Sequence, residues 1–371
     1  MKNHQHYKTM TLAVAGAMST LLGASSAFAQ SSITLYGMMD TGITYVSNQG
    51  GKHNLKMDDG VNGPNLWGMT GTEDLGGGTK AFFQLVNQFQ IDNGSFMNGK
   101  SLFSRTSIVG LSNDRFGKLS LGNQYDFMTD SLYFGGDDPA EASGHFYDFR
   151  AGPFQKLALP GNPTGAFDWD RMAGETVNNS VKYVTPTFNG FSAGAMYEFG
   201  GVAGSIGTGN GTSFALNYAM QNFGVNAAYT NLKTVVTGEG DVSVRNWGIG
   251  AHYRFGGWLT NALFTTVHNS YNGGSVYEGS VGAHYNFTPA LSAGASYMYM
   301  KGNDVVDNNH AHQVAAIVDY ALSKRTSVYA LAVYQRASSG GLAQINGMNS
   351  SDGASSGQTQ AVARVGLHTR F

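Results

Sequence analysis

Two short motifs in this chain have the residue types and spacing of known chemical sites. Residues 94–101, GSFMNGKS, match G-x-x-x-x-G-K-[ST], in which backbone amides and a lysine hold nucleotide phosphates. Residues 353–357, GASSG, match G-x-S-x-G, in which a strained turn exposes a nucleophilic serine. Each site requires a strand before the motif and a helix after it. Whether either motif carries chemistry therefore depends on the segments around it.

The flanking segments do not supply that context. Residues 94–101 follow a predicted strand and lead into LFSRTSIVGLS, which alternates as a second strand. Residues 353–357 lie in the low-complexity tract GMNSSDGASSGQTQ, where nothing holds Ser355 in a strained turn. We therefore interpret both motifs as loops, and we predict no enzyme activity and no cofactor.

The N-terminus has the order of features typical of a secretory signal peptide. Lys2 and Lys8 precede an apolar run over residues 11–22, and Ala27-Phe28-Ala29 forms a small-x-small cleavage site. We predict that residues 1–29 are a cleaved signal peptide. Its removal changes the formal charge from −2 to −4, which gives no reason to expect a nucleic-acid partner. The chain has no cysteine, so disulfides and thiolate metal sites are excluded.

The composition leaves two architectures. The chain contains 52 Gly, 19 Tyr and 22 Phe, and only 12% of its residues are charged, against about 25% in soluble domains. After the signal peptide, no run reaches the roughly 18 apolar residues of a membrane helix. The chain is therefore either a soluble glycine-rich β protein or a closed transmembrane barrel, which satisfies every backbone group within the membrane.

Alternation of side chains favours the barrel. In residues 81–91, AFFQLVNQFQI, large apolar residues share one face and glutamines the other, and residues 291–300 repeat this period of two. Aromatic residues recur at the segment ends, as membrane interfaces require. We predict an all-β, antiparallel, up-and-down transmembrane β-barrel of about 16 strands, near residues 32–46, 62–73, 80–91, 102–112, 117–127, 176–186, 190–199, 212–221, 223–232, 243–255, 257–268, 275–287, 290–301, 311–322, 325–336 and 359–371.

Short and long connections alternate along the chain. SNDRFG, TPTFNG, FGG and FTPA are short turns, whereas the connections near residues 47–61, 128–175, 200–211, 301–310 and 337–358 are long and polar. Outer-membrane barrels place short turns on the periplasmic side and long loops outside. Residues 128–175 form the longest connection, and a loop of this length usually has a function.

Several motifs, in order, carry a resemblance to a known family. SSITLYGMMDTGITYVS, GTEDLGGGTKAFFQL, SRTSIVGLSNDRFGKLSLGNQYD, NNSVKYVTPTFNGFSAGAMYEFGG and VGLHTRF together resemble the general diffusion porins of Gram-negative bacteria, of the β-proteobacterial type, over about residues 31–371. The resemblance implies a homotrimeric outer-membrane porin domain over residues 30–371, with a third exterior loop at about 128–175 folded into the lumen. It also implies lipid and lipopolysaccharide as neighbours, and assembly machinery that recognises the C-terminal Phe371.

The resemblance further implies an acidic third loop facing a basic wall. Here the loop offers Asp137, Asp138 and Glu141 as constriction acids. Arg105 and Arg171 match basic positions of the wall, and alternation adds Lys182. Alternation alone places Arg105 on the face of Val109 and Leu111, so its assignment to the lumen rests on the resemblance. Three other expected basic positions are occupied by Leu66, Thr70 and Asn123.

The thinned basic wall predicts a weakly selective or mildly cation-preferring channel for ions and small hydrophilic solutes. A substrate-specific channel for a sugar or small organic acid is the alternative, because FYDF at 146–149 and AFDWD at 166–170 place aromatics in the loop. A barrel enzyme and a soluble adhesin are the other rival classes. We predict no metal site: His310 and His312 lack a third ligand nearby, and Asp58 and Asp59 are interpreted as solvated loop acids.

Overall fold

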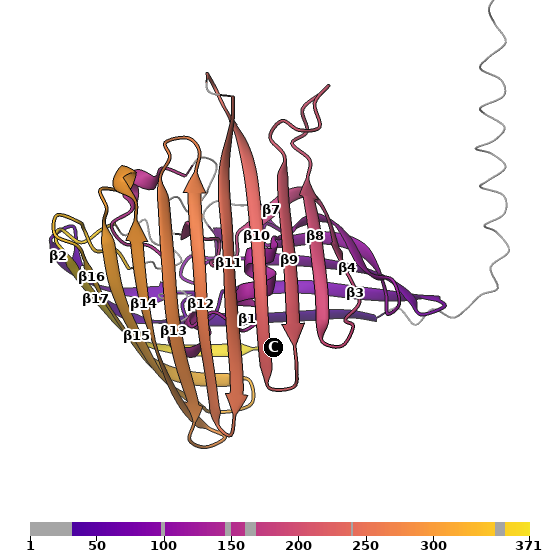
Figure 1. The fold of residues 1–371 in the computed structure, drawn as a ribbon. Helices are drawn as coiled ribbons and strands as arrows, with labels where there is room; N and C mark the ends of the chain where they lie inside the picture. The colour runs from indigo at the N-terminus through magenta and orange to yellow at the C-terminus, as the bar shows by residue number, and fades with distance from the viewer. Residues whose placement is uncertain (1–31, 98–100, 145–149, 160–167, 239, 346–352) are drawn as a thin grey trace, which may run out of the picture.

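The computed structural model describes residues 32–97, 101–144, 150–159, 168–238, 240–345 and 353–371, and the predicted signal peptide lies outside them. Seventeen antiparallel strands form one sheet that closes on itself (Figure 1). The strands are β1 Ser32–Gln49, β2 Lys52–Asp59, β3 Leu66–Gly76, β4 Thr79–Gln88, β5 Thr106–Asn113, β6 Gly117–Tyr125, β7 Thr176–Val184, β8 Phe191–Glu198, β9 Gly211–Ala219, β10 Phe223–Val236, β11 Gly240–Phe255, β12 Trp258–Asn269, β13 Ser275–Asn286, β14 Leu291–Gly302, β15 His310–Ala321, β16 Thr326–Ala337 and β17 Thr359–Arg370.

The seventeen strands occupy sixteen positions in the barrel wall. One edge of β1 pairs with β17, and the other edge pairs first with β3, from Ser32 to Met38, and then with β2, from Thr41 to Gln49. β2 and β3 therefore share one position, which confirms the predicted barrel of about 16 strands. β2 was not predicted from the sequence, because its many polar residues and neighbouring glycines resemble a loop. β3 begins at Leu66, later than the predicted start at residue 62.

The two faces of the wall differ as the alternation predicted. On β11, Trp247, Ile249 and Tyr253 are exposed on the outer face, while Asn246 and Gly248 face the interior. The closed sheet pairs its backbone groups between strands, and its outer surface offers apolar side chains to hydrocarbon. None of the helices in the described residues is long and apolar enough to cross a membrane.

Aromatic residues gather at the end of the barrel that carries the short turns, which is the lower end of β9–β12 in Figure 1. Rings beside the β11–β12 and β13–β14 turns contact one another in series, with centroid separations of 5.5, 6.5, 4.6 and 4.9 Å along Tyr253, Phe255, Trp258, Tyr285 and Phe287. Such a belt is typical of a membrane–water interface. It marks where the bilayer ends.

Phe371 lies at the seam between the first and last strands. Its backbone N–H donates to the Gly37 carbonyl at 3.0 Å, and a Cβ added to Gly37 would lie 2.3 Å from the phenyl ring. The ring is about half exposed. Phe371 is thus an outward aromatic that extends the pairing of β17 with β1, and its role as an assembly signal stays a prediction.

The connection between β6 and β7, residues 126–175, is folded against the inner face of the wall. Its described residues include the short helices η2 (Met128–Tyr133), α2 (Ala140–Ser143) and η4 (Gln155–Leu157). η2 contacts β9, β10 and β11, and α2 contacts β12 to β15. We call this segment the inner loop. Because it rests on the polar face of a closed barrel, it occupies part of the interior.

Neither chemical motif has the context that its chemistry requires. Residues 94–97 lie in the turn region between β4 and β5, and a strand follows where a nucleotide site needs a helix; residues 98–100 lie outside the described part of the chain. The Ser355 hydroxyl donates to the Thr359 carbonyl at 2.8 Å in a loop before β17. Among the described residues there is no group of three or more potential metal ligands.

Glycines on the inner face make room for the inner loop, and this predicts a steric test. A Cβ added to Gly294 of β14 would lie 1.8 Å from the Ala142 carbonyl oxygen of α2. We expect Gly294→Ala to displace α2, destabilising the fold by about 1–3 kcal/mol and making residues 126–175 more sensitive to protease. Gly279→Ala is the matched control, since nothing lies within 4 Å of that position. Equal protease sensitivity of the two variants would contradict the packing described here.

Candidate functional site

The inner loop begins with an apolar anchor. Phe127, Met128 and Leu132 are buried against small inward residues of the wall, including Ala215 and Ala228. The Phe127 N–H also donates to Ser213 Oγ at 3.0 Å. Because the wall side chains are small here, the loop backbone can approach the sheet closely. The anchor fixes where the rest of the loop lies.

Asp137, one of the predicted constriction acids, is fully buried between the inner loop and the wall. Its Oδ1 lies 2.7 Å from His252 Nδ1, and its Oδ2 accepts a hydrogen bond from Asn226 Nδ2 at 2.8 Å. Burial raises the pKa of the Asp137 carboxyl to about 6, although the bonds to His252 and Asn226 oppose this shift. Asp137 is therefore a titratable attachment of the loop to β10 and β11.

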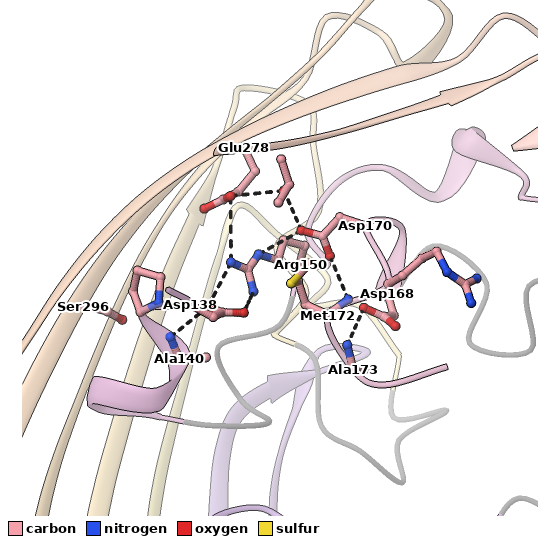
Figure 2. Close-up of polar contacts among 12 residues, drawn as sticks. Asp138, Ala140, Arg150, Asp168, Asp170, Met172, Ala173, Glu278 and Ser296 are labelled. Carbon is pink, nitrogen blue, oxygen red and sulfur yellow. Dashed lines mark hydrogen bonds and ion pairs between the residues drawn. The ribbon is translucent and has the colours of Figure 1, made fainter. Parts of the chain in front are cut away.

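Asp138 belongs to a buried ion cluster around Arg150 (Figure 2). The Arg150 guanidinium contacts both Asp138 oxygens, at 2.8 and 3.1 Å, and its Nε lies 3.0 Å from Asp170 Oδ2. Glu278 of β13 approaches to 3.8 Å, and Thr265 of β12 donates to Asp170 at 2.6 Å. We call Arg150, Asp138, Asp170 and Glu278 the Arg150 cluster. It joins both halves of the inner loop to the wall.

The charge balance of the Arg150 cluster depends on its one cation. Burial by itself would lower the pKa of Arg150, but the charge of Asp138, followed by those of Asp170 and Glu278, raises that pKa well above its usual value. Removing a single partner from a buried pair leaves an uncompensated charge, which costs about 3–5 kcal/mol. Arg150 therefore holds three carboxyl groups together that would otherwise repel one another.

Arg171, predicted as a basic wall residue, lies instead at the neck of the inner loop. It forms an ion pair with Asp126 at the start of the loop, and its Nη1 lies 3.2 Å from Glu175 at the end. Only 7% of Arg171 is exposed. The structure thus places Arg171 as a clasp between the two ends of the loop.

Glu141 is the one predicted loop acid that is exposed. A Cβ added to Gly136 would lie 3.3 Å from Glu141 Oε2 and 3.7 Å from both Arg254 Nη2 and His252 Nδ1. Glu141 therefore lies near the inward side chains of Arg254 and His252 on β11. Of the three predicted acids, the structure groups Asp138 with Arg150, Asp137 with His252, and Glu141 with Arg254.

A cavity of about 500 Å³ lies between η2 and the wall made by β1, β3 to β7 and β17. Its ionisable lining is mostly basic, with Arg105, Lys118, Lys182 and Arg370 against the acid Asp130. Its aromatic lining is Tyr36, Tyr125, Tyr133 and Phe134. This cavity lies in the barrel interior beside the inner loop, and we call it the lumen cavity.

Arg105 faces the lumen cavity because it precedes β5 and does not follow the alternation of that strand. β5 begins at Thr106, and the Arg105 guanidinium donates to Gln88 and lies 5.4 Å from the centre of the Tyr125 ring. Lys182 on β7 pairs with Asp130 and donates to the Tyr125 carbonyl at 2.8 Å. Two of the predicted basic residues, Arg105 and Lys182, therefore share this cavity.

Some residues that organise the inner loop were not predicted from the sequence. Arg150 and Asp130 lie within the predicted loop, but no local pattern distinguishes them from other loop charges. Trp169, predicted among the aromatics that could form a solute track, is fully buried and packs edge-on against Phe154 with ring centroids 6.4 Å apart. Residues 146–149, the other predicted aromatic stretch, lie outside the described residues.

The features above define a class of protein. A closed barrel with an apolar outer face, a polar interior and a loop folded against its inner wall is a transmembrane channel. The chain belongs to the Gram-negative porin family, whose model matches residues 11–340. It is therefore an outer-membrane channel protein and not an enzyme, as the sequence analysis predicted.

Individual relatives agree with this assignment. Outer membrane porin protein 32 of Delftia acidovorans is 31% identical over 371 residues, covering 96% of this chain and 98% of the relative. An outer membrane porin protein of Bordetella pertussis is 32% identical over 273 residues, or 66% of each chain. Among solved structures, an anion-selective porin from Comamonas acidovorans has a TM-score of 0.76 at 24% identity, over 92% of this chain and all of that one. The trimer form of OmpT from Vibrio cholerae has a TM-score of 0.64 at 15% identity, over 92% and 99%.

The Arg150 cluster predicts a strong effect of one substitution. Arg150→Gln leaves three buried carboxyl groups without their cation, so we expect a loss of about 3–5 kcal/mol and an unsteady single-channel current as the loop detaches. Adding Asp138→Asn and Glu278→Gln to Arg150→Gln is expected to restore a steady current. Lys156→Gln, which breaks an exposed pair with Asp307, serves as the control and should change stability by less than about 0.5 kcal/mol. A steady current from Arg150→Gln would show that the cluster does not hold the loop.

Proposed function

We propose that this porin forms a water-filled channel for the passive diffusion of ions and small hydrophilic solutes, and that it works as a homotrimer. The observation that carries the proposal is the lumen cavity, a charged space beside an inner loop in a closed barrel. The trimer form of a solved porin of the same fold supports the assembly. The inner loop is proposed as the constriction, because it occupies part of the barrel interior and leaves the lumen cavity open beside η2.

The lumen cavity also supports a revised proposal for selectivity. A mild cation preference was expected because three wall positions lack basic residues while the acids of the loop remain. Asp137 and Asp138, however, are buried against His252 and Arg150. The cavity offers four basic side chains and Asp130, which is itself paired with Lys182. Charges that line a narrow aqueous neck set the local ion concentration. We therefore propose weak selectivity with a mild preference for anions, in place of cations.

A substrate-specific channel remains the second candidate, on a different observation from the one expected. The aromatic residues that border the lumen cavity are Tyr36, Tyr125, Tyr133 and Phe134, and none belongs to the two predicted aromatic stretches. Aromatic faces beside cations would suit small organic acids with an apolar body. Block of the current by one class of sugar or organic acid at millimolar concentration would favour this candidate.

Conductance in a planar bilayer tests the proposed function directly. We expect stable ohmic steps that close in thirds, because each barrel of a trimer conducts independently. In a potassium chloride gradient, the sign of the reversal potential should favour chloride by less than about tenfold. Absence of steps would contradict an open channel, and a cation-favouring potential would contradict the proposed selectivity while leaving the channel itself intact.

Arg105 provides a sharper test of selectivity. We expect Arg105→Ala to move the reversal potential toward cations, because it removes one positive charge from a cavity that is screened less than open solvent. Arg325→Ala, in the exposed turn between β15 and β16, is a control of equal charge. An equal shift from both variants would mean that the change in net charge, and not the lining of the cavity, sets selectivity.

The raised pKa of Asp137 predicts a dependence on pH. With a pKa of about 6, the carboxyl is mostly ionised at pH 7.5 and mostly protonated at pH 5, so the interior loses one negative charge as the pH falls. We expect the anion preference to increase between these two values. Asp137→Asn should reduce this increase, because it removes the carboxyl that takes up the proton. The same pH response in the wild type and in Asp137→Asn would exclude Asp137 as the titrating group.

A further inference from the structure

A buried imidazole nitrogen borders the lumen cavity near the seam of the barrel. His368 of β17 is 6% exposed, and within the described part of the chain its Nε2 has no hydrogen-bond partner. The same residue lines the lumen cavity. A buried polar atom costs free energy unless something binds to it. The proposed transport function gives this nitrogen no role, so we asked what else lies beside it.

A thioether lies beside the same nitrogen. In the register of β1 and β17, Met38 is opposite Arg370, two residues beyond His368, so Met38 and His368 are diagonal neighbours on the inner face. Gly63 lies against both side chains. A Cβ added to Gly63 would lie 3.2 Å from His368 Nε2 and 3.4 Å from Met38 Sδ. The space that this glycine leaves is therefore bordered by one nitrogen donor and one sulfur donor.

The segment that carries Gly63 is attached to β1 on both sides of the glycine. Before it, the Asp40 carbonyl accepts the Gly60 N–H at 3.0 Å, and Asp40 Oδ1 accepts the Val61 N–H at 2.9 Å. After it, the Asp40 N–H donates to Asn65 Oδ1 at 2.6 Å. These bonds fix the distance of the segment from the wall. The space beside Gly63 is thus a fixed feature of the fold.

The charges around this space disfavour a hard cation. Asp40, which is opposite His368 in the register, forms an ion pair with Arg364 at 3.0 Å. Among the described residues that line the lumen cavity, Asp130 is the one acid, and it pairs with Lys182. Hard cations such as Mg²⁺ and Ca²⁺ require several oxygen ligands, which are not gathered here. Thioether and imidazole donors instead select soft ions, above all Cu(I).

We propose that Met38 and His368 form a binding site for a soft monovalent metal ion, Cu(I) or its analogue Ag(I). His368 Nε2 and Met38 Sδ are the ligands, and Gly63 leaves the space between them. Both ions accept low coordination numbers, and the unbranched methionine side chain can rotate to close on an ion held by the imidazole. The sequence pattern did not indicate this site, because its ligands come from the first and last strands. The site requires the closed barrel and does not depend on the proposed transport function.

Isothermal titration calorimetry with silver nitrate, on the detergent-solubilised protein in chloride-free buffer, tests the proposal. We expect Met38→Leu and His368→Gln each to weaken the tightest site by at least about tenfold, and an excess of Mg²⁺ to leave that site unchanged. Leucine is close to methionine in volume, so the wall keeps its packing. The matched control is Met220→Leu, at an exposed methionine in the turn between β9 and β10, which should bind like the wild type.

X-ray absorption at the copper edge identifies the ligands directly. With one equivalent of Cu(I) bound under anaerobic conditions, we expect nitrogen and sulfur in the first shell, and loss of the sulfur in Met38→Leu. Gly63→Ala retains both ligands and places a Cβ between them, so it should also weaken silver binding.

Several outcomes would overturn the proposal. Equal weakening in Met220→Leu would show that silver binds methionines at random, and displacement by Mg²⁺ would show a site for hard cations. A first shell of nitrogen and oxygen without sulfur would exclude Met38 as a ligand. Heat-dependent gel mobility reports whether each variant contains the folded barrel. If Met38→Leu does not fold, the absorption spectrum of the wild-type protein and the silver titration of Gly63→Ala decide the question.

Discussion

The structure depends on one constraint, which is that no strand edge can stay unpaired in hydrocarbon. β1 meets this constraint at the seam, because its 18 residues are long enough to pair with β17 on one edge and with β3 and then β2 on the other. Phe371 extends the seam by exchanging backbone hydrogen bonds with Gly37. Once the sheet is closed, strand alternation alone divides the side chains into an apolar outer set and a polar inner set.

The closed barrel encloses an interior that the inner loop partly fills. Two kinds of contact hold the loop against the wall. Its first part packs apolar side chains against small wall residues, and its later part uses the buried Arg150 cluster. The acids of that cluster are occupied in holding the loop. The charged side chains that line the lumen cavity are therefore mainly those of the wall, such as Arg105 and Lys118. A structural use of carboxylates thus changes the electrostatics of the channel.

On the outer face, which contacts lipid, charged residues are also confined to particular positions. Charged side chains are expensive near the middle of a bilayer and tolerable at its edges. Arg336 and Lys301 lie at the edge, next to tyrosines that belong to the interface. The barrel therefore has two separate groups of cations, one in its interior and one on its outer face at the end that carries the long loops.

The sequence by itself determined the class of the protein. Period-two alternation, low charge and alternating connection lengths were sufficient for a transmembrane barrel of about 16 strands with one long loop, and they placed Lys182 on the inner face. Alternation could not identify β2, because its many polar residues obscure the period-two pattern of apolar and polar side chains. It also could not place Arg105, because that residue precedes the first regular position of β5.

Only the tertiary structure decided which charges face water. Asp138 pairs with Arg150, which is only twelve residues away in sequence. The same guanidinium also contacts Asp170, in the later part of the loop, and Glu278, on strand β13 of the wall. Alternation specifies the face on which a side chain lies, and it carries no information about the segment that packs against that face. Pairing between charges distant in sequence is set by how the loop folds inward. Asp137 and Asp138, which the sequence suggested as pore charges, therefore hold the loop in place through buried contacts.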